Sequence, residues 1–136
     1  MVDTVNQKGS RKTLRILLAE DEDIYQQIIK NFAESLGLHI TIVGNGKNCI
    51  LEAGNHYYDI ILMDIDMPKK NGLEVTRELR EKGIKIPIIA VTANTWKEDK
   101  IRSLQSGMND FLPKPLSKKN LEKTILYWSK QSIAKS

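Results

Sequence analysis

Five polar residues whose side chains could handle a phosphoryl group each follow a short apolar run of the chain. Glu20 and Asp21 come after the first run, Asp64 and Thr92 after two later runs, and Lys114 after the last. Open α/β folds bind ligands at the carboxyl ends of their parallel strands. If the apolar runs are such strands, three carboxylates, a hydroxyl and an ammonium share one crevice.

The three carboxylates predict a bound divalent cation. Carboxylates within a few ångströms of one another repel and raise each other's pKa values unless a cation lies between them. Mg²⁺ is the hard, oxygen-seeking ion that suits such ligands. A carboxylate at this place can attack phosphorus and become an acyl phosphate. We expect Asp64 to be that carboxylate, because it leaves a buried strand into a loop that contains Pro68 and Gly72.

The same acidic residues also have a purely structural interpretation. An aspartate at the end of a strand often caps a loop amide. Glu20 and Asp21 stand with Glu22 and Asp23 at the start of a predicted helix, where the helix dipole favours negative charge. We adopt that interpretation for Glu22 and Asp23. For Glu20 and Asp21 the predicted approach of Asp64 from a neighbouring strand favours a metal site.

The apolar runs are typical of strands that are covered on both faces, since most lack polar alternation. The predicted strands span residues 14–19, 40–43, 59–63, 86–91 and 110–112. Helical patterns lie between and after them, at residues 24–36, 46–55, 72–82, 96–106 and 118–132. Right-handed crossovers then predict an α/β fold: a flavodoxin-like, doubly wound, five-stranded parallel sheet in the order 2-1-3-4-5 with five helices.

The first and last helical segments have the clearest inward faces. Apolar residues from Ile24 to Leu36 recur at spacings of mostly three and four, which predicts one buried stripe, and Gly37 marks the end of the helix. In the last segment Leu121, Ile125 and Trp128 lie on one predicted inward face.

Size and composition indicate one soluble domain. The chain has 136 residues, 40% of them hydrophobic and 28% charged. We expect a flexible lead or linker at residues 1–13, the domain at 14–132 and a C-terminal tail at 133–136. The start of the chain lacks the apolar segment of a secretory signal, and no apolar stretch reaches the roughly 18 residues that span a bilayer. We therefore expect a cytoplasmic protein without membrane contact.

The net charge of +4 does not indicate nucleic-acid binding. Residues 1–13 carry a net charge of +2 and residues 114–136 carry +5, so the middle of the chain is net negative. Basic stripes with interleaved aromatic residues and helix-turn-helix or zinc-finger patterns are lacking in the sequence. We expect solvated basic ends and no direct contact with nucleic acid.

Four segments of the sequence resemble the signature stretches of the response-regulator receiver domain. They are residues 17–21 (LLAED), 61–68 (ILMDIDMP) with Gly72 after it, 91–93 (VTA) and 114–115 (KP). Their order and spacing match the family over about residues 14–129. One such motif would be weak evidence, but four in order make coincidence very improbable.

The resemblance implies a role for each matching residue at the acidic site. Asp64 resembles the phosphoacceptor aspartate, which takes a phosphoryl group from a phosphohistidine on a partner. Glu20 and Asp21 resemble the acidic pair that holds Mg²⁺, with the backbone carbonyl of Asp66 as a further ligand. We expect the side chain of Asp66 to face water.

The resemblance also implies a conformational switch. Thr92 resembles the hydroxyl residue that reorients toward a phosphoryl oxygen, and Lys114 resembles the lysine that pairs with another. The Lys114–Pro115 peptide bond is then cis. Phe111 stands where the family has its switch aromatic, so the surface formed by the last two helices and the last strand is expected to change shape for a partner.

The family's partners and activity follow in the same way. The resemblance implies a histidine kinase or a histidine phosphotransfer protein as the partner. It implies a phosphoacceptor signalling domain in a two-component system or phosphorelay, not an enzyme, with self-catalysed phosphotransfer and autodephosphorylation only. The acidic pair reads Glu-Asp instead of the commoner Asp-Asp. In the family this Glu-Asp variant occurs often in receivers attached to hybrid sensor kinases. The sequence leaves the oligomeric state open.

Two alternatives remain open. Asp64-Ile65-Asp66 also matches the Asp-x-Asp of haloacid-dehalogenase-type phosphatases, although in that family the motif usually follows the first strand, and Glu20 and Asp21 would then lack a role. The second alternative is a pseudo-receiver that binds partners without phosphorylation.

Overall fold

The structure is a computed structural model of the chain and describes residues 13–93 and 97–135. Five strands and five helices alternate along it. The strands are β1 (Arg15–Ala19), β2 (His39–Val43), β3 (Ile60–Asp64), β4 (Ile88–Thr92) and β5 (Asp110–Pro113). The helices are α1 (Asp23–Ser35), α2 (Gly46–Asn55), α3 (Gly72–Glu81), α4 (Lys97–Ser106) and α5 (Lys118–Lys135). All paired strands are parallel, in the predicted order β2-β1-β3-β4-β5.

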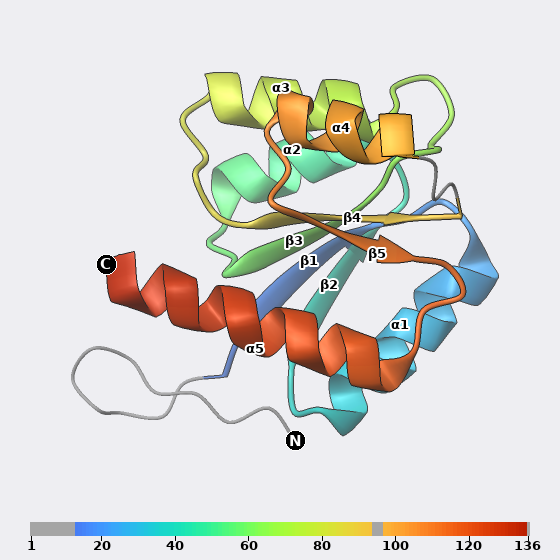
Figure 1. The fold of residues 1–136 in the computed structure, drawn as a ribbon, viewed down its shortest axis with the longest axis vertical. Coiled ribbons are helices and arrows are strands. Elements are labelled where there is room, and N and C mark those ends of the chain that lie inside the picture. Colours follow the sequence, from blue (N-terminus) through green and yellow to red (C-terminus); the bar gives the residue numbers. More distant parts are fainter. Residues whose placement is uncertain (1–12, 94–96, 136) are drawn as a thin grey trace.

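Helices cover both faces of the sheet, with α1 and α5 on one side and α2, α3 and α4 on the other (Figure 1). Alternate strand residues face the two layers. In β1, for example, Ile16 and Leu18 pack with Ile29 of α1 and Ile125 of α5, whereas Leu17 packs in the cluster on the opposite face. Because both faces are covered, β3 and β4 are buried at every position.

The ends of two central strands lie one residue later than predicted. β3 ends at Asp64 and β4 ends at Thr92, so both residues belong to their strands rather than to the loops. β4 also begins at Ile88, two residues after its predicted start, directly after Pro87, which lacks a backbone N–H donor. The two strand ends therefore hold Asp64 and Thr92 at the carboxyl edge of the sheet.

The remaining boundaries that the structure describes lie within one residue of the prediction, except the end of α5. α5 continues to Lys135, beyond its predicted end at residue 132. The predicted lead lies outside the described residues except for Thr13, and so does position 96, the predicted start of the helix that is described from Lys97. In the part of the chain that the structure describes, no helix has the length and apolar character needed to cross a bilayer.

The prediction that Ile24 belongs to the buried stripe of α1 is wrong, because its side chain is 73% exposed. The buried face of α1 is centred on Ile29 and Ala33. At 3.6 residues per turn, Ile24 lies about 140° around the helix from Ile29 and about 180° from Ala33. The prediction for α5 is confirmed, since Leu121 and Ile125 are buried and Trp128 is partly buried against the same core.

Candidate functional site

Three carboxylates meet at the carboxyl edge of the sheet, as predicted. Glu20 and Asp21 directly follow β1, and Asp64 ends β3, which pairs with β1. One oxygen of each of the three lies within 4.8 Å of the others. Glu20 is 0% and Asp64 2% exposed. The fold therefore concentrates negative charge in a place that water hardly reaches.

Main-chain donors orient two of these carboxylates. The amide of Glu22 donates to Glu20 Oε2 over 3.1 Å, and the amide of Asp66 donates to Asp64 Oδ1 over 3.0 Å. By contrast, Asp21 Oδ1 is buried and accepts no hydrogen bond from the described residues. A buried anionic oxygen without a donor is unfavourable, and a hard divalent cation would satisfy it. The set of ligands thus fits Mg²⁺.

Lys114 supplies the positive charge of the site. Its Nζ lies 2.8 Å from Glu20 Oε1 and 3.8 Å from Asp64 Oδ1, and its side chain is 5% exposed. Its amide donates to the carbonyl of Thr92 over 2.8 Å, which ties the loop after β5 to the end of β4. The predicted cis peptide bond between Lys114 and Pro115 is confirmed.

Burial and neighbouring charges shift the ionisation of the site. Burial, and next the charge of Glu20, raise the pKa of Asp64 from 3.8 to about 7, against the opposing effect of Lys114. Burial by itself lowers the pKa of Lys114, but its hydrogen bond to Glu20 and the charge of Asp64 outweigh this, so the net shift is upward. The site without a cation therefore holds a proton more tightly than an ordinary carboxylate.

Without a divalent cation, the free energy of unfolding should fall as the pH rises from about 5 to about 8. The raised pKa of Asp64 means that the folded chain keeps a proton in this range that the unfolded chain has already lost. We expect the Asp64→Asn variant to lack this slope and to be more stable than the parent near pH 8 by on the order of 2 kcal/mol. Urea unfolding at the two pH values measures both effects. Asp66→Asn, which changes an exposed carboxylate, should keep the parent's slope.

The start of α3 packs directly against the backbone of Asp64. Gly72 is buried, and a Cβ at this position would lie 2.4 Å from the carbonyl oxygen of Asp64 and 2.9 Å from Met63 Cγ. Its amide donates to the carbonyl of Ile65 over 2.9 Å. The glycine predicted to punctuate this loop therefore lets α3 begin close to the end of β3.

We expect Gly72→Ala to destabilise the fold by about 2 kcal/mol or more, because its Cβ would force backbone apart. Gly54→Ala is the matched control, since Gly54 lies in α2 with open space around its position. That change should stabilise by about 0.5 to 1 kcal/mol through helix propensity. Thermal or urea unfolding measures both. Equal stabilities of the two variants would show that the approach of α3 to Asp64 is looser than described.

Thr92 ends β4, which pairs with β3 on the side opposite to β1. Its side chain is buried, and its hydroxyl donates to Asp66 Oδ2 over 3.3 Å. Asp66 is exposed, as predicted, but its hydrogen bond with Thr92 was not expected. The two residues link the loop after β3 to the end of β4.

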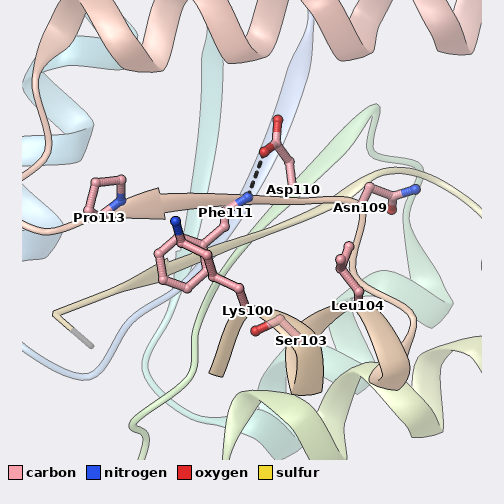
Figure 2. Close-up of a pocket in the computed structure, with 7 residues that line it drawn as sticks. All are labelled: Lys100, Ser103, Leu104, Asn109, Asp110, Phe111 and Pro113. Atoms are coloured by element: carbon pink, nitrogen blue, oxygen red, sulfur yellow. Dashed lines mark hydrogen bonds between the residues drawn. The ribbon is translucent and has the colours of Figure 1, made fainter. Parts of the chain in front are cut away.

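Phe111 lies on β5 at a second location, a cavity of about 440 Å³ between α4 and β5. The ring is half-buried, and Lys100 Nζ lies 5.4 Å from its centroid. Figure 2 shows the Lys100 side chain over the ring, with Ser103 and Leu104 of α4 beside the cavity. Phe111 thus belongs to the α4 and β5 surface and not to the acidic cluster.

Sequence reasoning missed one neighbour of the site, Tyr25. The ring of Tyr25, in the first turn of α1, lies under the ammonium of Lys114, with 4.1 Å between Nζ and the ring centroid. The available signal was its position four residues after Asp21, which is the spacing that brings side chains to one side of a helix start. That signal does not identify Lys114 as the partner.

Comparisons with known proteins agree with this geometry. Residues 16–126 match the family model of the response regulator receiver domain. The chain is 42% identical over 120 residues to the hybrid signal transduction histidine kinase I of Dictyostelium discoideum, covering 82% of this chain and 7% of that protein. It spans 20% or less of the length of the first curated relatives that it matches.

Two solved structures are informative. One is the receiver domain of sensor histidine kinase PA1611 from Pseudomonas aeruginosa, with a magnesium ion coordinated in its active site cleft. It is 39% identical to this chain and has a TM-score of 0.81, and the match covers 88% of this chain and 99% of that one. The other contains the receiver domain of Ssk1 in complex with the histidine phosphotransfer protein Ypd1 from Saccharomyces cerevisiae. It is 27% identical, has a TM-score of 0.83, and the match covers 89% of this chain and 92% of that one.

Proposed function

Because the chain belongs to the response regulator receiver domain family, we propose that it accepts a phosphoryl group from a phosphohistidine of a partner onto Asp64. The observation that carries the proposal is the cluster of Glu20, Asp21 and Asp64 with Lys114 against it. Three carboxylates and one ammonium form a place where a cation and the oxygens of a phosphoryl group can both be neutralised.

Mg²⁺ is the ion that we assign to this cluster. Glu20, Asp21, Asp64 and the backbone carbonyl of Asp66 would hold it, and the buried oxygen of Asp21 without a donor supports the assignment. When bound, the ion supplies positive charge to the carboxylates and to the phosphoryl oxygens. The magnesium ion in the related Pseudomonas receiver also supports it.

The transfer itself is a displacement at phosphorus. A carboxylate oxygen of Asp64 forms a bond to phosphorus while the bond from phosphorus to the imidazole nitrogen of the partner breaks, and the imidazole leaves with the electron pair. Lys114 is placed to pair with one phosphoryl oxygen, since its Nζ lies 3.8 Å from Asp64 Oδ1. The hydroxyl of Thr92 has to exchange its bond to Asp66 for one to another phosphoryl oxygen.

The added phosphoryl group then changes the balance of contacts at the end of β4. Phosphorylation takes the side chain of Asp64 from a charge of about −1 to about −2 and adds strong acceptor oxygens. Movement of Thr92 toward these oxygens opens space behind β4, into which Phe111 can rotate. The surface of α4, β5 and α5 changes with it, which gives a partner two states to distinguish.

We expect Lys114→Ala to accept a phosphoryl group about tenfold more slowly, or slower still, and to lose the conformational response. Asp64 remains as the acceptor, but the ammonium that draws the loop after β5 toward the phosphoryl group is gone. Hydrogen exchange across β4, α4 and β5, with and without phosphorylation, measures the response. Lys118→Ala, which removes an exposed lysine nearby, should label and respond like the parent. A normal response in Lys114→Ala would contradict its role.

The partner and the setting are proposed on the same basis. A histidine kinase or a histidine phosphotransfer protein supplies the phosphoryl group, as the Ypd1 complex of the related Ssk1 receiver supports. The chain acts as a phosphoacceptor with self-catalysed uptake and loss, rather than as an enzyme that turns over a separate substrate. We place the domain in the cytoplasm, the compartment that the sequence predicts.

Incubation with acetyl phosphate, with and without Mg²⁺, tests the proposal. We expect intact-mass spectrometry to show one added phosphoryl group that requires the ion. Turnover of a phosphate ester without a retained group would instead indicate a haloacid-dehalogenase-type phosphatase. If the chain neither gains the group nor turns over an ester, it is a pseudo-receiver and the proposal is wrong.

A further inference from the structure

The ammonium of Lys114 has a neighbour besides the two carboxylates, namely the face of the Tyr25 ring. Lys114 Nζ lies 4.1 Å from the ring centroid, 2.8 Å from Glu20 Oε1 and 3.8 Å from Asp64 Oδ1. A cation over an aromatic face is attracted by the quadrupole of the ring, most strongly where water is excluded. The side chain of Lys114 is 5% exposed, so this condition is met.

Glu20, which binds the Lys114 ammonium through its carboxylate, also anchors the helix turn that carries Tyr25. Gln26, next to Tyr25, donates from its side-chain amide to the backbone carbonyl of Glu20 over 2.6 Å. Its backbone amide donates to the carbonyl of Glu22 over 3.0 Å, which forms the first turn of α1. These two bonds fix the start of α1, the helix turn that carries Tyr25, next to Glu20.

A lysine needs such a restraint more than most residues, because its four-carbon stem is flexible and its ammonium is a point charge. We propose that Tyr25 is a positioning residue for phosphoryl transfer, whose ring face holds the Lys114 ammonium against Glu20 and Asp64 before the phosphoryl group arrives. The inference rests on the proposed function. It gives α1 the task of positioning the Lys114 ammonium, in addition to the metal binding proposed for the acidic residues.

The inferred contact uses the ring face of Tyr25 and not its hydroxyl, so two substitutions of Tyr25 can separate the face from the hydroxyl. Tyr25→Phe keeps the face, and Tyr25→Leu replaces it with an apolar side chain that has no quadrupole. With acetyl phosphate and saturating Mg²⁺, we expect the uptake rate of the Leu variant to fall about three- to tenfold and that of the Phe variant to stay within about twofold of the parent. The Mg²⁺ affinity of both variants should match that of the parent.

A double-mutant cycle separates positioning from a general loss of packing. In a Lys114→Met background, Tyr25→Leu should change the uptake rate no further, because the ammonium that the ring holds is already gone. If Tyr25→Leu slows uptake equally in both backgrounds, or if Tyr25→Phe is as slow as Tyr25→Leu, the inference is overturned.

A second readout needs no phosphorylation. The methylene protons next to the Lys114 ammonium should resonate upfield through the ring current of Tyr25, and this shift should persist in Tyr25→Phe and vanish in Tyr25→Leu. Absence of the shift in the parent overturns the inference even if the chain is labelled. A parent that shows the shift but is never labelled by acetyl phosphate overturns the proposed function, and with it the catalytic meaning of the contact.

Discussion

We expect the Asp64→Asn variant to take up no phosphoryl group from acetyl phosphate under conditions that label the parent fully. The substitution keeps the shape of the side chain at the end of β3, but a neutral amide oxygen does not attack phosphorus as a carboxylate does. Intact-mass spectrometry after incubation with the donor and Mg²⁺ measures the difference. Because Asp64 is buried beside Glu20, its removal should leave the fold intact and relieve repulsion between carboxylates.

The matched control is Asp66→Asn, two residues further along the chain. Asp66 is exposed and offers its side chain to the hydroxyl of Thr92, so its substitution tests whether any carboxylate of this loop suffices. We expect Asp66→Asn to be labelled. Labelling of Asp64→Asn at the parent's level would show that the acceptor is a different residue.

The second large effect concerns the metal site. We expect Asp21→Asn to weaken Mg²⁺ binding by about tenfold or more, because it removes a charged ligand. Asp21 is a better choice than Glu20 for this test. Loss of Glu20 would leave the buried ammonium of Lys114 without its 2.8 Å partner, whereas Asp21 Oδ1 accepts no hydrogen bond from the described residues. The variant should therefore fold normally and take up phosphoryl only at raised Mg²⁺ concentrations.

Isothermal calorimetry with Mg²⁺ measures the affinity, and Asp23→Asn serves as its control. Asp23 is an exposed acid in the first turn of α1, close to Asp21 in the sequence but outside the carboxylate cluster. Its substitution should leave the affinity within about twofold of the parent's. Equal losses in the two variants would mean that the ion responds to the general charge of this edge and is not bound by the cluster.

Local sequence patterns were sufficient to predict the sheet and most of the site. Apolar runs without polar alternation mark strands that are covered on both faces, and the polar residue that ends each run has to emerge at one edge. This is why the sequence predicts that Glu20, Asp64 and Lys114 lie together at that edge. The ends of β3 and β4 shifted by one residue, but the edge at which the side chains emerge did not change.

Contacts between segments far apart in the chain could not be predicted in this way. Ile24 fits a spacing of four from Ile28, yet the buried face of α1 is set by what the sheet presents to it, and Ile24 is exposed. Arg80 of α3 donates to the carbonyl of Gly107 and to Asn109 Oδ1 and so fixes the loop between α4 and β5. No periodicity relates Arg80 to these residues, because the contact exists only after the helices have packed.

The most direct measurement is the location of the phosphoryl group on the chain. Borohydride reduces an aspartyl phosphate to homoserine, and tandem mass spectrometry of the digested, labelled chain then identifies the modified position. We predict homoserine at position 64 and at no other aspartate. Homoserine at position 21 or 66, or a phosphoryl group retained on His39 or His56 with Asp64 unmodified, would contradict the assignment of the acceptor.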